Sequence, residues 1–124
     1  MLIKLLLVDD SSDFLRALSG YLATQPSLQV VGIAHSVEEA LARARSGFRP
    51  DLVLMDINLP GTDGLSGTRR LKTELPGTAI IIVSLLDGQA YREAAQAYGA
   101  DAFVSKATLN RDLLPTIRSV VSSQ

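Results

Sequence analysis

The sequence predicts an α/β domain in which helices cover both faces of a parallel β-sheet. Short apolar runs without alternating polar residues recur along the chain, as in strands that are buried on both faces. A segment with apolar residues at helical spacing follows each run, so a strand and a helix alternate five times. This alternation predicts a parallel sheet with right-handed crossovers, in which all strands end at one edge.

The expected elements begin and end at residue types that suit their boundaries. The strands are expected at residues 2–8, 28–34, 52–55, 78–84 and 101–105, with a helix after each. Polar N-caps are expected at Ser11 or Ser12, Ser36, Asp63 and Asp87. Glu39 has the capping-box spacing from Ser36, and Gly47 is expected as the left-handed residue that ends the second helix.

Two residues are unfavourable in the helices that contain them. Gly67 lies within the third helix, where it is expected to cost about 1 kcal/mol relative to Ala. Pro115 lies in the last helix, and proline is tolerated there only in the first turn or with a kink. We therefore expect this helix to start late or to bend near residue 111.

Composition limits the class of protein. The 124 residues, of which 47% are hydrophobic, fit one folded domain over residues 1–124. The formal net charge of −1 argues against direct nucleic-acid binding by this domain. The chain has no Cys and a single His, His35, which excludes cysteine zinc sites and histidine clusters. It has neither a membrane-spanning apolar run nor a signal peptide, so we expect a soluble cytoplasmic domain.

Polar side chains follow four of the five expected strands. Asp9 and Asp10 follow the first strand, Asp56 the third and Lys106 the fifth, while Ser84 ends the fourth. Because parallel strands end at one edge, these residues are expected to lie together where open α/β sheets bind ligands. A single strand-end acid could simply cap a turn, but that role does not explain polar groups on four strands.

The three carboxylates require a counter-charge. At ~4 Å and an effective dielectric constant of about 20, each pair of like charges costs on the order of 4 kcal/mol. Protons or a divalent cation must offset this repulsion, and oxygen ligands without His or Cys favour Mg²⁺. Once Mg²⁺ and Lys106 neutralise the negative charge of the pocket, one carboxylate can act as a nucleophile toward a phosphoryl group. Mg²⁺ and Lys106 would then bind the equatorial oxygens of that group during transfer.

Four segments carry a resemblance to a known family. They are Leu-Val-Asp-Asp at 7–10, Leu-Met-Asp-Ile-Asn-Leu-Pro-Gly-Thr-Asp-Gly at 54–64, Val-Ser at 83–84 and Gly-Ala-Asp-Ala-Phe-Val-Ser-Lys at 99–106. Together they resemble the receiver domain of two-component response regulators, over essentially the whole chain. The last segment and Leu-Leu-Pro-Thr-Ile-Arg at 113–118 look most like LuxR/NarL-type regulators. Those regulators usually carry a C-terminal helix-turn-helix, which would lie outside this chain.

The resemblance implies a flavodoxin-like, doubly wound sheet of strand order 2-1-3-4-5 with five helices. It implies a signalling switch that accepts a phosphoryl group from a sensor histidine kinase or phosphotransfer protein and controls transcription. The implied site residues are the phospho-acceptor Asp56, the phosphoryl-binding Lys106, the switch residues Ser84 and Phe103, and the Mg²⁺ ligands Asp9, Asp10, Asp56 and the backbone carbonyl of Asn58. The fourth helix, fifth strand and last helix would form the face that binds a partner or a second copy.

Other functions stay open at this point. One is a stand-alone phosphorelay receiver without a DNA-binding output. Another is a Mg²⁺-dependent aspartyl phosphatase of the haloacid dehalogenase type, which needs an acid two residues after the nucleophile, where Asn58 stands. A third is a flavin carrier of the same fold, which needs a glycine-rich phosphate loop where Asp9 and Asp10 would repel phosphate.

Several other residues are expected to have ordinary structural roles. Asp13 is interpreted as a first-turn acid of a helix and not as a metal ligand. His35 ends the second strand, away from the other polar residues, and is not expected to carry a phosphoryl group. The aromatic residues expected to serve only in packing are Phe14, Tyr91 and Tyr98.

Overall fold

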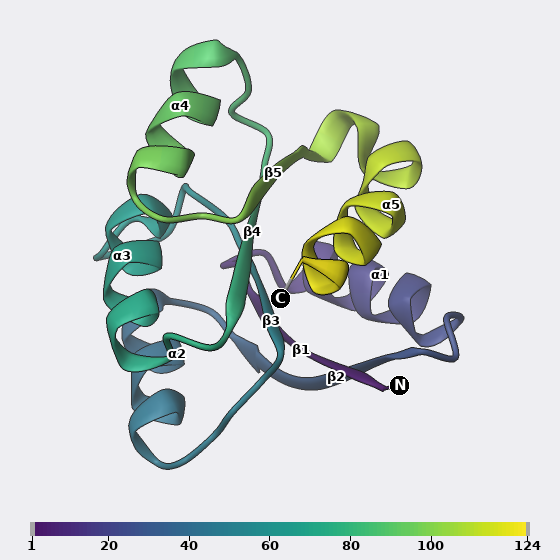
Figure 1. The fold of residues 1–124 in the computed structure, drawn as a ribbon, viewed down its shortest axis with the longest axis horizontal. Helices are drawn as coiled ribbons and strands as arrows, with labels where there is room; N and C mark the ends of the chain where they lie inside the picture. Colours follow the sequence, from purple (N-terminus) through teal and green to yellow (C-terminus); the bar gives the residue numbers. More distant parts are fainter. Residues whose placement is uncertain (1, 124) are drawn as a thin grey trace.

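The computed structural model describes residues 2–123, which form a sheet between two layers of helices (Figure 1). Its strands are β1 (Ile3–Val8), β2 (Leu28–Ala34), β3 (Leu52–Met55), β4 (Ala79–Ser84) and β5 (Ala102–Ser105). All neighbouring strands are parallel, and their order is β2-β1-β3-β4-β5. The predicted fold class and strand order are therefore confirmed.

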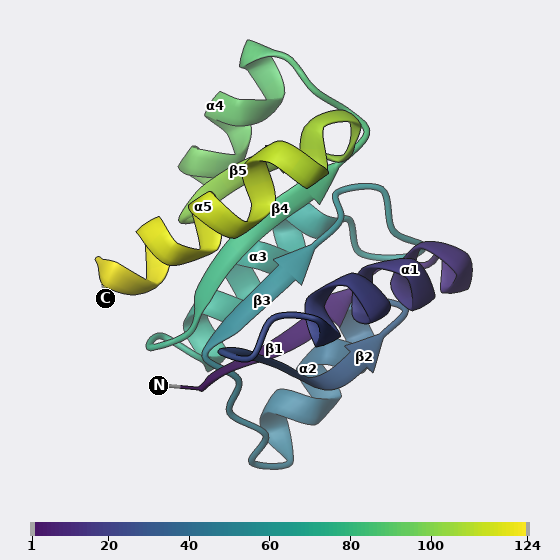
Figure 2. The ribbon, with the colours of Figure 1, turned by 90° about the vertical axis from the view of Figure 1, so that its right-hand side faces the viewer.

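Helices cover both faces of this sheet. They are α1 (Ser12–Ala23), α2 (Val37–Arg45), α3 (Gly64–Glu74), α4 (Gln89–Ala97) and α5 (Leu109–Ser122), with a 3₁₀ turn η1 (Lys106–Thr108) before α5. Figure 1 shows α2, α3 and α4 on one face of the sheet and α1 and α5 on the other. Figure 2, turned by 90°, shows α1 and α5 in front of the strands. Within residues 2–123, no helix is long and apolar enough to cross a membrane.

Each strand sends alternate side chains into two separate cores. Under α1 and α5 the strand residues include Leu5, Leu7, Leu52, Leu54, Ile81 and Val83. Under α2, α3 and α4 they include Leu6, Val8, Val53, Met55, Ile80 and Ile82. The central strands β3 and β4 are buried along their whole length, which explains their continuous apolar sequences. Burial on both faces holds the carboxyl ends of these strands in place for the site.

Side chains cap the first three helices as expected. The caps are Ser11 for α1, Ser36 for α2 and Asp63 for α3, each accepting a hydrogen bond from a backbone N–H of the first turn. The Glu39 carboxylate accepts from the backbone N–H of His35 at 3.0 Å, one residue before the cap itself. Gly47, with φ of 96°, ends α2 in the left-handed conformation that was predicted.

The expected cap at Asp87 is wrong. Gly88 precedes α4 with φ of 117°, and no side chain among residues 2–123 caps this helix. The left-handed turn directs the Asp87 carboxylate to the backbone N–H of Gly88, at 2.6 Å, and to the guanidinium of Arg92, at 3.1 Å. Asp87 therefore joins the loop after β4 to the helix that follows it.

Gly67 permits close packing between two helices. A Cβ atom at this position would overlap with Cγ2 of Val37 on α2. The missing side chain thus lets α2 and α3 approach each other, which offsets the low helix propensity of glycine.

A late start or a bend near residue 111 was expected for the last helix; the late start is wrong, and the bend stays a prediction. It begins at Leu109, and Pro115 lies inside it. The turn η1 leads directly into α5, and the Thr108 hydroxyl donates to the Asp112 carboxylate at 2.7 Å. Leu113 and Ile117, next to the proline, are buried in the core, so packing holds the helix despite the backbone bond that proline removes. The strands β1, β4 and β5 each begin one residue later than expected.

Candidate functional site

Three carboxylates meet at the carboxyl edge of the sheet. Each of Asp9, Asp10 and Asp56 offers one oxygen, and these oxygens lie within 4.8 Å of one another. Asp9 and Asp56 are 3% and 7% exposed, whereas Asp10 faces solvent. They come together because β1 pairs directly with β3. Carboxylate oxygens at this spacing, with one open side, suit a hard divalent cation such as Mg²⁺.

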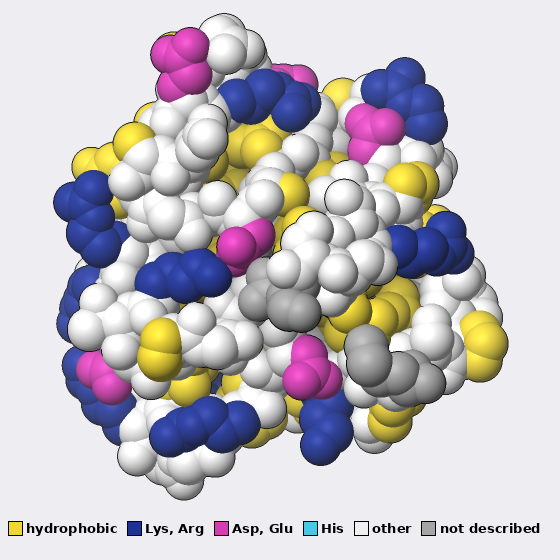
Figure 3. Space-filling view, in the orientation of Figure 1, with side chains coloured by type: hydrophobic (Ala, Val, Ile, Leu, Met, Phe, Trp, Pro, Cys, Tyr) yellow, Lys and Arg dark blue, Asp and Glu magenta, His cyan; other side chains and the backbone are white. Residues whose placement is uncertain are grey.

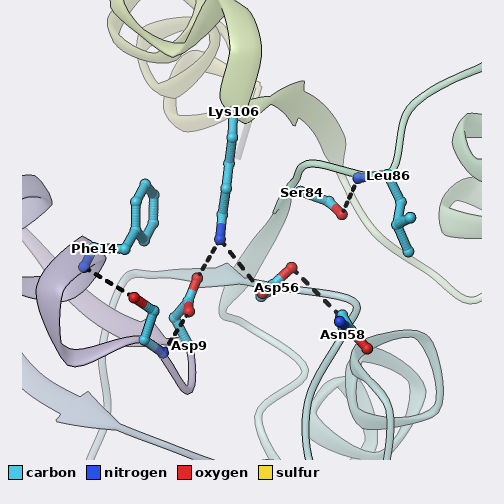
Figure 4. Close-up of polar contacts among 8 residues, drawn as sticks. Asp9, Phe14, Asp56, Asn58, Ser84, Leu86 and Lys106 are labelled. Atoms are coloured by element: carbon cyan, nitrogen blue, oxygen red, sulfur yellow. Dashed lines mark hydrogen bonds and ion pairs between the residues drawn. The ribbon is translucent and has the colours of Figure 1, made fainter.

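Lys106 brings a positive charge to this acidic cluster. Its Nζ donates to Oδ2 of Asp9 at 2.7 Å and to Oδ2 of Asp56 at 3.4 Å (Figure 4). Lys106 is the first residue of η1, directly after β5, so its side chain spans from the edge strand to the centre of the sheet. The side chain is only 11% exposed, which reduces the screening of these charges by water.

The carboxyl group of Asp56 is destabilised in its charged form. Burial raises the pKa of Asp56 above its usual value of 3.8, the charge of Lys106 opposes this increase, and the nearby Asp9 adds to it. The backbone N–H of Asn58 lies 3.4 Å from Oδ1 and stabilises the ionised form. An ionised Asp56 therefore gains strongly from any further positive charge in the pocket.

Ser84 ends the strand next to Asp56. Met55 pairs with Ile82 in the sheet register, so Asp56 and Ser84 both lie just beyond paired positions of β3 and β4. The Ser84 side chain is buried, and its Oγ accepts a hydrogen bond from the backbone N–H of Leu86 at 3.0 Å (Figure 4). The hydroxyl thereby fixes the start of the loop between β4 and α4.

Phe103 on β5 is held against α4. The ring is half-buried beside the core under α2, α3 and α4, and the guanidinium of Arg92 lies 4.7 Å from its centroid. Arg92 also pairs with Asp87 at 3.1 Å, so one side chain connects the loop after Ser84 to the aromatic ring.

A cavity of about 250 Å³ separates α4 from β5 next to this ring. Its lining residues are Arg92, Ala95, Gln96, Ala100, Asp101, Ala102 and Phe103. Figure 3 shows hydrophobic side chains at the bottom of the hollow beside α4. The ring of Phe103 thus has unfilled space beside it.

Other residues considered from the sequence lie apart from the acidic cluster. Asp13 is in the first turn of α1, is exposed and pairs with Arg16 at 3.5 Å. The Nδ1 of the exposed His35 lies 3.6 Å from Oε2 of Glu39. Neither belongs to the group of carboxylates around Asp56.

One residue at the site was not found from the sequence. The ring centroid of Phe14 lies 4.0 Å from Nζ of Lys106. Phe14 is spaced as a packing residue of α1, and nothing in its spacing indicates that Lys106 would reach its face. This contact depends on α1 and η1 lying side by side, which only the tertiary structure shows.

The comparison with known families fits this geometry. A family model of the response regulator receiver domain matches residues 5–118. The chain belongs to the response regulator receiver domain family. This receiver domain is 35% identical over 120 residues to the response regulator protein VraR of Staphylococcus aureus, an alignment that covers 95% of the chain. It covers 56% of VraR, so the chain spans about half the length of the curated relatives it matches.

Solved structures agree with this assignment. A two-component response regulator of the LuxR family from Aurantimonas sp. SI85-9A1 superposes with a TM-score of 0.92 at 27% identity, covering 100% of this chain and 88% of the other. The response regulator domain of Thermotoga maritima CheB superposes with a TM-score of 0.87 at 28% identity, covering 98% of each chain. The receiver domain is thus a two-component signalling switch with relatives of the LuxR/NarL type.

Proposed function

We propose that this receiver domain accepts a phosphoryl group on Asp56 and thereby changes a face that controls transcription. One observation carries the proposal: the buried Asp56 shares its pocket with two further carboxylates, within 4.8 Å, and with the ammonium of Lys106, at 3.4 Å. No ordinary structural role requires three acids and a lysine at this point. The arrangement supports phosphoryl transfer to a carboxylate, in which charge must be neutralised before attack.

In the reaction, an oxygen of Asp56 attacks the phosphorus of a phosphohistidine. The new P–O bond forms as the P–N bond to the donor breaks, and the electron pair of that bond stays on the histidine nitrogen. Mg²⁺ bound by Asp9, Asp10, Asp56 and the carbonyl of Asn58 would supply charge neutralisation for the phosphoryl oxygens. Lys106 is already within reach of Asp56 and would exchange its bond to Asp9 for one to a phosphoryl oxygen.

The donor histidine comes from a partner protein. The chain contains one histidine, His35, which is paired with Glu39 and does not belong to the cluster around Asp56. A sensor histidine kinase or a phosphotransfer protein fits this requirement. The receiver then acts only on itself, because Asn58 stands where an aspartyl phosphatase would need a general acid.

Ser84 connects the chemistry to the surface. Oγ of Ser84 accepts from the N–H of Leu86, and its own proton can be donated to a phosphoryl oxygen on Asp56. A shift of Oγ toward that oxygen would draw the loop after β4 with it. That loop carries Asp87, whose partner Arg92 lies over Phe103. Movement of the loop therefore changes the packing of Phe103 and the face formed by α4, β5 and α5. The changed face would bind a partner or a second copy of the receiver.

The acceptor is tested by incubation with acetyl phosphate and Mg²⁺. We expect the intact mass to increase by one phosphoryl group, and Asp56→Asn to abolish the increase. Asp13→Asn is the matched control, because Asp13 is an exposed acid of the neighbouring helix turn that lies outside the cluster. Equal labelling of Asp56→Asn and the unmodified protein would show that Asp56 is not the acceptor.

A further inference from the structure

The ring of Phe14 closes one side of the Lys106 ammonium. Nζ lies 4.0 Å from the ring centroid, within the range of a cation–π interaction. Figure 4 shows the ring on one side of the Lys106 side chain and Asp56 on the other. The ammonium is therefore held by two carboxylates and one aromatic face.

The first turn of α1 fixes this ring relative to the acids. Oδ1 of Asp9 accepts the backbone N–H of Ser11 at 2.9 Å, and Oγ of Ser11 accepts the backbone N–H of Phe14 at 3.1 Å. One capping residue thus holds both the carboxylate that binds Lys106 and the turn that carries the ring. These two hydrogen bonds lie in one turn, so they tie Asp9 to the backbone of Phe14.

If the ring of Phe14 were absent, the Lys106 side chain could turn its ammonium group away from the acids. A groove of about 260 Å³ between α1 and the start of α5 is lined by residues that include Phe14, Tyr21, Lys106 and Leu109. Lys106 has a long flexible stem, and loss of the ring would open a path for its ammonium toward this groove and water.

The aromatic face also differs from the two carboxylates in how it responds to the reaction. Asp9 and Asp56 change their charge environment when a cation binds or when Asp56 is phosphorylated. The ring of Phe14 neither titrates nor binds the metal, so its attraction for the ammonium stays the same in every state of the site. Of the contacts that Lys106 makes within residues 2–123, the ring is the one whose attraction is unchanged by metal binding or by phosphorylation of Asp56.

We propose that Phe14 is a positioning residue that keeps the Lys106 ammonium directed at Asp56 and at the phosphoryl group transferred to it. This inference rests on the proposed phosphoryl transfer to Asp56. The proposal assigns a role at the site to a side chain of α1, the helix whose N-cap residue Ser11 donates its backbone N–H to Asp9. The orientation of Lys106 then depends on the aromatic face and not merely on the bulk of the side chain.

The test uses two measurements on a graded series of variants. The first is the rate at which a succinimidyl ester acylates Lys106, read by mass spectrometry with the exposed Lys4 as internal reference. The second is the initial rate of phosphorylation by acetyl phosphate at saturating Mg²⁺. For Phe14→Leu we expect faster acylation of Lys106 and slower phosphorylation, each by roughly five- to thirtyfold, as for loss of a partly desolvated cation–π contact.

The ring-retaining variant Phe14→Tyr should keep both rates close to those of the unmodified protein. Tyr21→Leu is the matched control, because Tyr21 lies on the same helix and lines the same groove, and it should change neither rate. If Phe14→Leu does not fold, Phe14→Met provides an apolar side chain of similar size and is expected to give the same losses.

Two results would overturn the proposal. One is unchanged rates in Phe14→Leu or Phe14→Met, and the other is equal loss in these variants and in Phe14→Tyr, which would indicate packing alone. The acylation rate needs no phosphoryl transfer. If the unmodified protein takes up no phosphoryl group, the proposed function fails, while the acylation series still decides whether the ring holds Lys106.

Discussion

Lys106, just after the last strand, forms an ion pair with Asp9, just after the first strand, with Nζ and Oδ2 at 2.7 Å. Its contact with Asp56 is longer, at 3.4 Å. In the structure the lysine thus serves mainly as the counter-charge of Asp9. Cation binding to the acids would take over this task and leave the lysine available for a phosphoryl oxygen.

This division of charge predicts the behaviour of Lys106→Met. Removing the ammonium leaves two buried carboxylates without their cation, a change that typically costs about 3 kcal/mol or more. We expect a lower melting temperature without Mg²⁺, and a larger stabilisation by Mg²⁺ than in the unmodified protein. Thermal denaturation with and without millimolar Mg²⁺ measures both. An equal response to Mg²⁺ in the two proteins would mean that lysine and metal do not share the same acids.

Asp10 should control metal binding with little effect on the metal-free fold. It is the exposed member of the acidic cluster and has no hydrogen-bond partner through its side chain among residues 2–123. At ten times the dissociation constant, Mg²⁺ should stabilise the unmodified protein by about 1.4 kcal/mol. Asp10→Ala should abolish this gain, with Asp13→Ala as the control that retains it. If millimolar Mg²⁺ does not change the melting temperature of the unmodified protein, the prediction of a Mg²⁺ site at these acids is wrong.

The pKa of Asp56 predicts how stability depends on pH. Burial raises this pKa above 3.8 in the folded state, so folding favours the protonated form of Asp56. Its favourable contribution is fully present below pH 3.8 and is lost as pH rises through the raised pKa. In metal-free buffer, Asp56→Asn should therefore stabilise the protein at pH 7, by an amount that decreases toward acidic pH. Urea denaturation across this range measures the difference, and a gain that is independent of pH would exclude the titration as its cause.

The close packing around Gly67 predicts that Gly67→Ala destabilises the protein, although alanine has the higher helix propensity. Alanine is the better helix former by about 1 kcal/mol, but its Cβ would overlap with Val37. Overpacking of this kind costs about 1–3 kcal/mol, so we expect Gly67→Ala to lower the free energy of unfolding. The double variant with Val37→Ala should show less than the sum of the two single losses. Additive losses in urea denaturation would show that the two positions do not compete for space.

Variants of Phe103 and Ser84 should lose phosphorylation-dependent association while Asp56 can still be phosphorylated. Phe103→Ala leaves the acids and Lys106 in place, so Asp56 should be phosphorylated at a near-normal rate, but phosphorylation-dependent association should be lost. Ser84→Ala should also take up the phosphoryl group and transmit it poorly, whereas Ser84→Thr keeps the hydroxyl. Mass spectrometry measures uptake, and light scattering before and after phosphorylation measures association. If Phe103→Ala lost phosphorylation to the same extent as association, Phe103 would have only a structural role.

Much of the site could be predicted because local sequence determines it. A buried strand with a polar residue at its end, repeated along the chain, is enough to place Asp9, Asp56, Ser84 and Lys106 at one edge of a parallel sheet. The resemblance to receivers supplied the strand order, which the apolar runs alone leave undetermined. Neither the strand-end positions nor the strand order depends on a contact between two particular side chains.

What could not be predicted depends on contacts between distant elements. The overlap between Gly67 and Val37 exists because α2 and α3 pack together, so a residue with low helix propensity becomes necessary. Asp87 has the residue type of a cap, but the backbone turn at Gly88 assigns it to Arg92 instead. Phe14 has the spacing of a core residue, and only the approach of η1 to α1 brings Lys106 over its ring.

The ion pair between Asp9 and Lys106 joins residues 97 positions apart, so the site spans most of the chain. A ribosome produces the acids early and the lysine late. Because β5 is the last strand added, a chain interrupted before it has an acidic pocket without its cation and without the edge strand of the sheet. If phosphoryl transfer proceeds as proposed, we expect competence for it only when synthesis has passed η1.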